Sequence, residues 1–130
     1  MKIKEIEKIF EELVVMDSFD KIQSIDELSK KMLNYCAQMA FVNQEMASAK
    51  RALNEKKIFA YNTLGEVQKR QGFTLPASKQ KDYVEALYSD HTFYFDLCER
   101  CSRTLVHTVD ALRTCISALK MEKIYSSNQT

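Results

Sequence analysis

The residues that most strongly interrupt helices fall in one short window of this chain, and their placement constrains the fold more than any other feature. The only two glycines, Gly65 and Gly72, and the only proline, Pro76, lie within twelve residues of one another. Glycine and proline are the poorest helix formers. The chain on either side of this window is therefore free to form long, uninterrupted helices.

Apolar residues recur at helical spacing on both sides of the window. Spacings of four and three residues, averaging 3.5, keep one apolar stripe facing a partner helix over many turns. We therefore predict an all-α fold: a long antiparallel, coiled-coil-like helical hairpin plus a short N-terminal helix. The first stripe is Leu28, Met32, Tyr35, Met39, Val42, Met46, Ala49 and Leu53, then, after a slip at Lys56, Ala60 and Val67; the second is Val84, Leu87, His91, Tyr94, Cys98, Cys101, Leu105, Thr108, Leu112, Cys115 and Leu119.

Local signals divide this single helical domain, residues 1–130, into its elements. Apolar residues at helical spacing predict a short amphipathic helix over residues 1–17. Ser24 followed by Glu27 fits a capping box, so a long helix is predicted over residues 24–70. Residues 71–77 then form the bend, residues 78–125 a second long helix, and residues 126–130 a polar tail.

The composition predicts a folded chain in a reducing compartment. Hydrophobic residues make up 45% and charged residues 28%, which is the balance of a globular protein and not of a disordered one. We find no secretory signal, and no stretch approaches the ~20 apolar residues that a membrane span needs. The four cysteines lie mostly on apolar helix faces. We expect a cytoplasmic protein with free thiols and no membrane partner.

Positive charge gathers around the predicted bend. Residues 50–81 hold eight basic side chains against two acidic ones, whereas residues 1–29 hold four basic and eight acidic ones. Phe59, Tyr61 and Phe73 lie close to the basic residues in sequence. Lysines beside aromatic rings are typical of proteins that bind single-stranded nucleic acid, although a solvated charged face is the plain alternative. The candidate nucleic-acid-binding residues are Lys50, Arg51, Lys56, Lys57, Lys69 and Arg70.

One aromatic segment exceeds what a two-helix contact can bury. Phe93, Tyr94 and Phe95 are consecutive, so their side chains point around most of the helix. Large exposed apolar patches usually mark interfaces. We expect the N-terminal helix and a second subunit to cover this segment, and hence a homo-oligomer. The predicted oligomer interface comprises Tyr88, Phe93, Tyr94, Phe95, Leu105 and Leu112.

The cysteines and histidines offer weak signals for chemistry. Cys98 and Cys101 form a CxxC pair that, with His91, Cys115 and Cys36, would be enough to assemble a zinc site. The pair lies in the middle of a helix on the apolar stripe, however, where cysteine behaves as a small buried hydrophobe. We therefore expect core packing, no metal and no cofactor. No phosphate loop or nucleophile elbow is present, so we expect no enzyme activity.

Several short segments match a known family in order along most of the chain. They are Met16-Asp17-Ser18, Lys21-Ile22-Gln23, Gln44-Glu45-Met46 with the alanine- and lysine-rich helix ending near Tyr61 to Gly65, and Asp96-Leu97-Cys98 through Cys101-Ser102 to the end of the last helix. In these segments the chain resembles the UvsY recombination mediators of T4-like phages. That family is helical, forms rings, binds single-stranded DNA and helps load a RecA-like recombinase onto strands covered by single-strand-binding protein.

The resemblance implies a non-catalytic recombination mediator, acting in the cytoplasm of an infected host cell if a phage encodes it. Its partners would be single-stranded DNA, a RecA-like recombinase, single-strand-binding protein and further copies of itself in a ring. The family's basic DNA-contacting stretch falls beside Lys56 and Lys57, but Ile58 and Ala60 stand where the family has basic residues. The alternative is a structural or adaptor protein, such as a virion or scaffold component, that acts only through protein packing. A zinc-dependent enzyme is a distant third.

Overall fold

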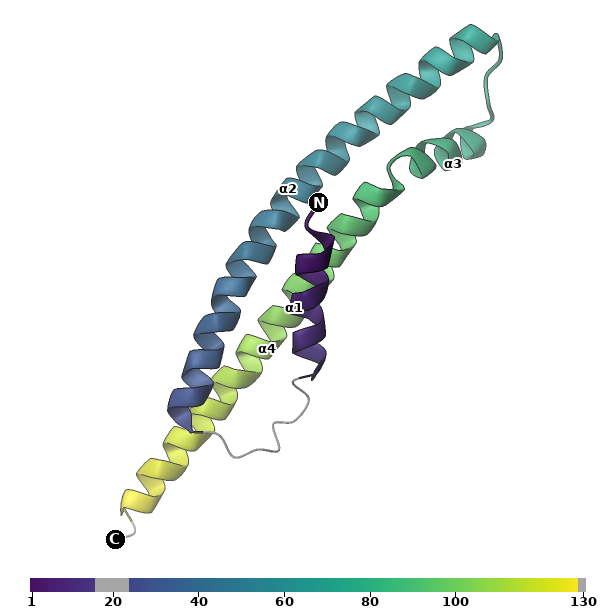
Figure 1. Ribbon diagram of the computed structural model, residues 1–130. Coiled ribbons are helices and arrows are strands. Elements are labelled where there is room, and N and C mark those ends of the chain that lie inside the picture. The colour runs from purple at the N-terminus through teal and green to yellow at the C-terminus, as the bar shows by residue number, and fades with distance from the viewer. Residues whose placement is uncertain (16–23, 129–130) are drawn as a thin grey trace.

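The computed structural model describes residues 1–15 and 24–128, and this part of the chain folds into four helices. They are α1 (Ile3–Val15), α2 (Ile25–Gln71), α3 (Ala77–Leu87) and α4 (Ser89–Asn128). Helices α2 and α4 run side by side as a long hairpin, with α3 next to the bend and α1 packed halfway along the rod (Figure 1). The predicted all-α hairpin with a short N-terminal helix is confirmed.

Helix α2 is long because both of its ends are capped and nothing in between interrupts it. Its 47 residues span about 70 Å at 1.5 Å per residue. At the start, the Ser24 hydroxyl oxygen accepts a hydrogen bond of 3.2 Å from the Glu27 N–H, as the capping box predicts. At the end, Gly72 adopts φ 71°, and its N–H donates to the Gln68 carbonyl oxygen at 2.9 Å.

The bend occupies residues 72–76, and two glutamine side chains tie it down. The Leu75 N–H donates to Gln68 Oε1 at 2.7 Å. The Leu75 carbonyl oxygen in turn accepts a bond of 2.6 Å from Gln80 Nε2. Pro76 comes directly before α3, where its missing N–H costs no helical bond. Leu75, the fourth of the five bend residues, is thus held from both helices that flank the bend.

The two glycines are expected to respond in opposite directions to substitution by alanine. A Cβ at either position meets nothing within 4 Å, so backbone preference alone sets the effect. Gly65 lies inside α2, and Gly65→Ala should raise the free energy of unfolding by up to about 1 kcal/mol. Gly72 is left-handed, and Gly72→Ala should lower it by about 1 kcal/mol. Urea unfolding followed by circular dichroism measures both, and a shift of the same sign in both variants would contradict this reasoning.

The predicted helix over residues 78–125 is wrong in one respect, because it is broken at Tyr88. Tyr88 has φ −116° and ψ 17° and separates α3 from α4. Two hydroxyls accompany the break: Ser89 Oγ donates to the Ala86 carbonyl at 3.2 Å, and Thr92 Oγ1 donates to the Tyr88 carbonyl at 3.3 Å. Thr63 and Thr104 make the same kind of bond to an earlier carbonyl inside unbroken helices, so such a hydroxyl is not by itself a signal for a break.

The core forms two clusters of buried side chains. The larger one joins α1, α2 and α4, and the smaller one lies near the bend between α2 and α3. The CxxC cysteines are fully buried in the larger cluster, which confirms the core-packing prediction. The buried residues are Ile6, Leu13, Leu28, Tyr35, Val42, Ala49, Tyr94, Cys98, Cys101, Leu105, Val109, Leu112 and Ile116 in the larger cluster and Ala60, Leu64 and Val84 in the smaller one.

The spacing of the buried residues changes along the hairpin. Near its start, α2 follows the seven-residue repeat of a coiled coil, and later positions step by eleven. Eleven residues over three turns give 3.67 per turn, close to the 3.6 of a straight helix. Such helices stay in register without the left-handed supercoil that the heptad pattern implies. The eleven-residue steps join Val42, Leu53 and Leu64 in α2 and Tyr94, Leu105 and Ile116 in α4.

This change of repeat corrects the second predicted stripe. Thr108 and Cys115 were expected on the stripe but are only half-buried. Their neighbours Val109 and Ile116 are buried instead. Where the true repeat has lengthened to eleven residues, a seven-residue repeat carried on from the preceding turns selects the residue one position before the buried one.

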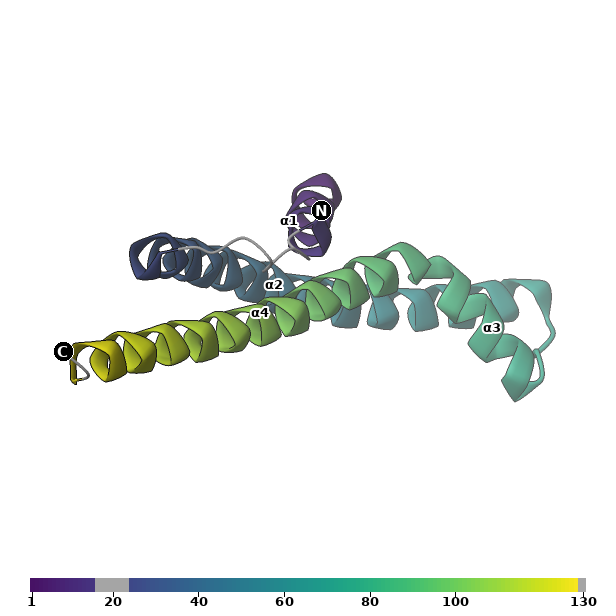
Figure 2. The ribbon, with the colours of Figure 1, turned by 90° about the horizontal axis from the view of Figure 1, so that it is seen from below.

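Helix α1 lies on one side only of the α2–α4 pair, as Figure 2 shows from below. It packs mainly on α4, with Ile6 and Leu13 buried. An ion pair ties its start to α2: Lys2 Nζ lies 3.3 Å from Glu45 Oε1 and 5.3 Å from the centre of the Phe41 ring. The Tyr94 hydroxyl donates to Glu45 Oε2 at 2.8 Å, so the Glu45 carboxylate links all three helices.

This linkage predicts an acid-sensitive contribution to stability. The hydrogen bond from Tyr94 and the ion pair with Lys2 lower the pKa of Glu45, although burial opposes them. A carboxyl group with a lowered folded pKa stabilises the fold above its unfolded pKa of about 4.3, and the contribution is lost as the pH falls through the folded value. Glu45→Gln should therefore destabilise the protein near pH 7, and this difference from wild type should shrink toward about pH 3.

Urea unfolding at several pH values measures this effect. Glu66→Gln, at an exposed position of α2, is the matched control and should follow the wild-type pH profile. If Glu45→Gln were equally destabilised at both ends of the pH range, the charge of the carboxylate would not be what holds α1.

The far end of α4 also differs from the prediction. The helix continues to Asn128 instead of ending at residue 125, and it extends past the start of α2 (Figure 1). Met121, Ile124 and Tyr125 are each more than half exposed there. Among the described residues, no helix has the length and apolar character needed to cross a membrane.

Candidate nucleic-acid interface

Helix α2 presents two flanks beside its buried face, and only one of them is next to α1. Residues seven apart lie almost above one another, since two helical turns take 7.2 residues. We call Phe41, Glu45, Ser48, Ala52, Lys56 and Phe59 the α1 flank, because Lys2 of α1 contacts its first two members. We call Asn43, Lys50 and Lys57 the open flank, which follows the opposite edge of the buried face.

The structure does not bring the six predicted basic residues onto one face. Successive residues in a helix are separated by about 100°. Lys56 and Lys57 therefore diverge to opposite flanks of the same helix, although they are adjacent in sequence. Lys50 and Lys57 do share the open flank, about 10 Å apart along the axis at 1.5 Å per residue.

The remaining members of the predicted set are engaged in other ways. Arg51 Nε lies 3.3 Å from Glu55 Oε1 on the exposed side of α2. Lys69 and Arg70 are in the last turn of α2, where positive charge stabilises the unpaired carbonyl groups of the helix end. These three residues keep their exposure but are not part of the open flank.

Two lysines lie over aromatic rings, one on each flank. Lys56 Nζ is 4.6 Å from the centre of the Phe59 ring, and Lys57 Nζ is 5.5 Å from the centre of the Tyr88 ring. Both distances are within the range of a cation–π contact. Phe59 is 58% exposed, so its ring is accessible for a nucleobase to stack on, beside the Lys56 ammonium group.

A groove of about 610 Å³ lies beside Lys57, where the break between α3 and α4 faces the open flank. Tyr88 and Phe95, both half-buried, provide its aromatic surface. Burial raises the pKa of Tyr88, and Glu85 and Tyr61 raise it further, so its hydroxyl keeps its proton. The lining residues are Leu53, Lys57, Glu85, Tyr88, Ser89, Thr92, Phe95 and Asp96.

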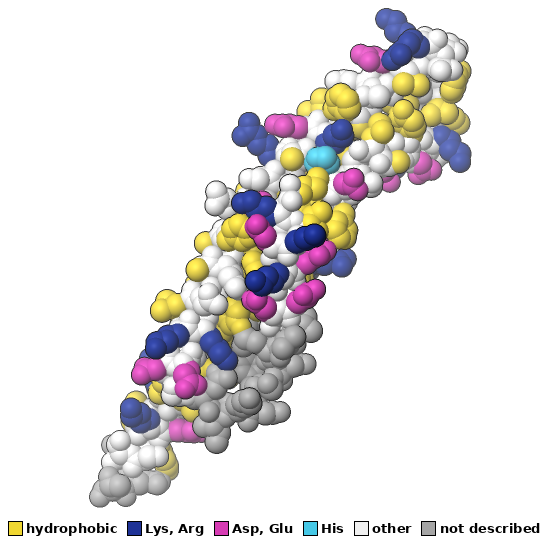
Figure 3. Space-filling model, viewed as in Figure 1, with side chains coloured by type: hydrophobic (Ala, Val, Ile, Leu, Met, Phe, Trp, Pro, Cys, Tyr) yellow, Lys and Arg dark blue, Asp and Glu magenta, His cyan; other side chains and the backbone are white. Residues whose placement is uncertain are grey.

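The face of the molecule seen in Figure 3 is mixed in charge. On the face seen in Figure 3, lysine and arginine side chains recur along the whole rod with acidic ones between them, and hydrophobic side chains gather toward the bend end. No continuous basic surface covers this face. Binding of a polyanion would thus depend on particular lysines and rings and not on a uniform field.

The predicted oligomer interface divides into residues that the single chain buries and residues that it leaves accessible. Tyr94, Leu105 and Leu112 are at most 4% exposed and belong to the core of one chain. Tyr88 and Phe95 line the groove beside Lys57. Phe93 is 53% exposed and is the member of this set most available to a second copy.

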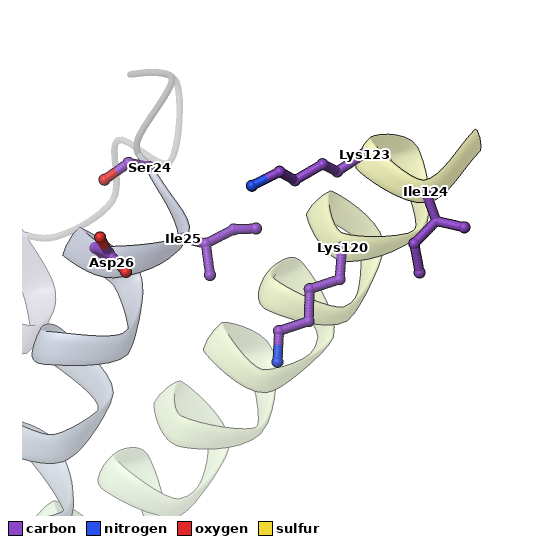
Figure 4. Close-up of a pocket in the computed structure, with 6 residues that line it drawn as sticks. All are labelled: Ser24, Ile25, Asp26, Lys120, Lys123 and Ile124. Carbon is purple, nitrogen blue, oxygen red and sulfur yellow. The ribbon is translucent and has the colours of Figure 1, made fainter. Parts of the chain in front are cut away.

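A second concavity, of about 500 Å³, lies at the opposite end of the rod, between the start of α2 and the end of α4. Lys123 extends from α4 across the opening toward Ile25, and Lys120 lines the same side (Figure 4). Ser24 and Asp26 line the other side. This end therefore also carries two lysines but has no aromatic ring among its lining residues.

The cysteines are arranged as core residues. Burial, with a further contribution from Cys98, raises the pKa of Cys101 to about 11. Burial likewise raises the pKa of Cys98. Both thiols therefore stay protonated near neutral pH and are poor nucleophiles. Within residues 1–15 and 24–128, no group of three or more histidine, cysteine or acidic side chains is placed to hold a metal ion.

Comparison of this chain with protein-family models, with curated proteins and with solved structures finds no match.

Proposed function

We propose that this protein binds single-stranded DNA without catalysis and acts as a recombination mediator, promoting the loading of a RecA-like recombinase while single-strand-binding protein is displaced. The observation that carries the proposal is the open flank. There, Lys57 lines a groove together with the half-buried rings of Tyr88 and Phe95, and Lys50 follows on the same flank about 10 Å farther along the helix axis. Cations that neutralise phosphates and rings that stack on bases are the combination used by proteins that bind single strands without reading sequence.

The mediator role comes from the resemblance to the UvsY family, and the rod shape supports it. A rod of about 70 Å offers separate places for DNA near the bend and for proteins elsewhere. The exposed side of α1 carries Glu5, Glu7, Glu11 and Glu12 together with Lys4 and Lys8, a charged surface on which a partner protein with complementary charges would dock. Association of several copies would add their weak DNA contacts together by avidity.

The test is a titration of the full chain against a fluorescent single-stranded oligonucleotide at increasing salt. We expect binding at low salt that weakens steeply, because each phosphate contact contributes about 0.7 to the slope of log affinity against log salt concentration. Duplex DNA of equal length is the comparison and should bind more weakly, since its bases are not free to stack on the rings. Absence of binding at low salt, or binding insensitive to salt, would refute the proposal.

The alternative is a structural or adaptor protein that acts only through protein packing. The exposed Met121, Ile124 and Tyr125 at the end of α4 favour this role, because they form an apolar surface without a partner in the described chain. Light scattering after size exclusion, with and without oligonucleotide, separates the two functions. An adaptor would show oligomers whose mass does not change when DNA is added.

A further inference from the structure

The groove beside Lys57 has a lining that a phosphate backbone alone does not explain. Lys57 brings one positive charge, whereas Glu85 and Asp96 bring two negative ones. A phosphate inside this groove would be repelled by both carboxylates, so the phosphate that the Lys57 ammonium contacts would lie at the edge of the groove and not within it. The lining therefore disfavours an anion and favours a group that donates hydrogen bonds to its carboxylates.

The aromatic part of the lining favours a planar ring. Tyr88 and Phe95 are half-buried and both line the groove, so part of each ring is accessible from it, with the Lys57 ammonium over the Tyr88 ring. Every nucleobase has a flat face that stacks favourably on an aromatic side chain. A nucleobase combines a planar ring with hydrogen-bond donors and acceptors at its edge. Its ring would stack on the aromatic side chains of the groove, its donors would bond to the carboxylates, and its acceptors would bond to the ammonium group.

We propose that this groove holds one base of the bound strand and prefers cytosine to thymine, an inference that rests on the proposed single-stranded DNA binding. The base would stack on Tyr88 or Phe95, and its exocyclic amino group would donate to the Asp96 carboxylate. Carboxylates accept hydrogen bonds from the N4 amino group of cytosine. Thymine has a carbonyl oxygen at that position, and an acceptor facing a carboxylate is repelled. Glu85 lies 3.9 Å from Lys81, which offsets part of its charge, so Asp96 is the main acceptor.

The experiment measures fluorescence anisotropy of the full chain with oligo(dC) and oligo(dT) of equal length, at a mildly alkaline pH where cytosines do not pair. Wild type should bind oligo(dC) about five-fold more tightly, the effect of one hydrogen bond of average strength. In Asp96→Asn, the amide offers a donor as well as an acceptor, so the ratio should fall to about one. Asp96 is exposed, so this variant keeps the fold.

Asp82→Asn is the matched control. Asp82 is an exposed aspartate of α3 that does not line the groove, so this variant makes the same change of charge elsewhere. It should strengthen binding to both oligonucleotides equally and leave their ratio at the wild-type value.

The outcomes separate this inference from the proposed function. Equal binding of wild type to both oligonucleotides, or a ratio that Asp96→Asn leaves unchanged, would overturn the base-binding groove while DNA binding itself stands. Absence of binding to either oligonucleotide would overturn the proposed function and the groove with it.

Discussion

Leu105→Ala is expected to lower the free energy of unfolding by about 3 kcal/mol, the typical cost of a cavity left by a buried leucine. Leu105 is fully buried where α4 packs in the larger core cluster. The sequence pattern assigned this residue to an interface between subunits, but the structure uses it inside one chain. The loss should therefore be the same at low and high protein concentration, measured by urea unfolding with circular dichroism.

Val106→Ala is the matched control for this prediction. Val106 is the next residue of α4 and is 42% exposed, so its truncation leaves no closed cavity. Its effect should stay within about 0.5 kcal/mol, as for most surface substitutions. A destabilisation by Leu105→Ala that disappears at low protein concentration would instead assign Leu105 to contacts between copies.

Replacing both Lys50 and Lys57 by alanine is expected to weaken binding of single-stranded DNA on the order of ten-fold at low salt, and to reduce the salt slope by about 1.4. These two lysines share the open flank, and Lys57 lies over the Tyr88 ring. Losing them removes two phosphate contacts near the rings on which bases would stack. Both side chains lie at the surface or its edge, so the helical content should not change.

The double variant of Lys120 and Lys123 to alanine makes the same change of net charge at the opposite end of the rod. These lysines line a concavity without an aromatic ring. Their removal should cost much less affinity. If the two double variants weakened binding equally, net charge and not the open flank would account for it.

Much of the fold was predictable because its signals are local. The placement of Gly72 and Pro76 predicts the bend, and Ser24 with Glu27 predicts the start of α2, since each acts on backbone groups within a few residues. The break at Tyr88 was not predictable in this way, because the apolar spacing continues through it and pointed to one unbroken helix. Spacing reports which residues face a partner and not whether the backbone between them stays helical.

The candidate site was predictable only in part. The sequence by itself determined that basic residues and aromatic rings gather near the bend of an all-α hairpin. Only the tertiary structure decided which of them act together: it separated Lys56 from Lys57, placed Tyr88 and Phe95 in one groove with Lys57, and buried Tyr94 and Leu105 within the chain. The physical reason is that a helix turns about 100° per residue, so neighbours in sequence diverge, and the flank that stays open depends on where α1 packs on α4.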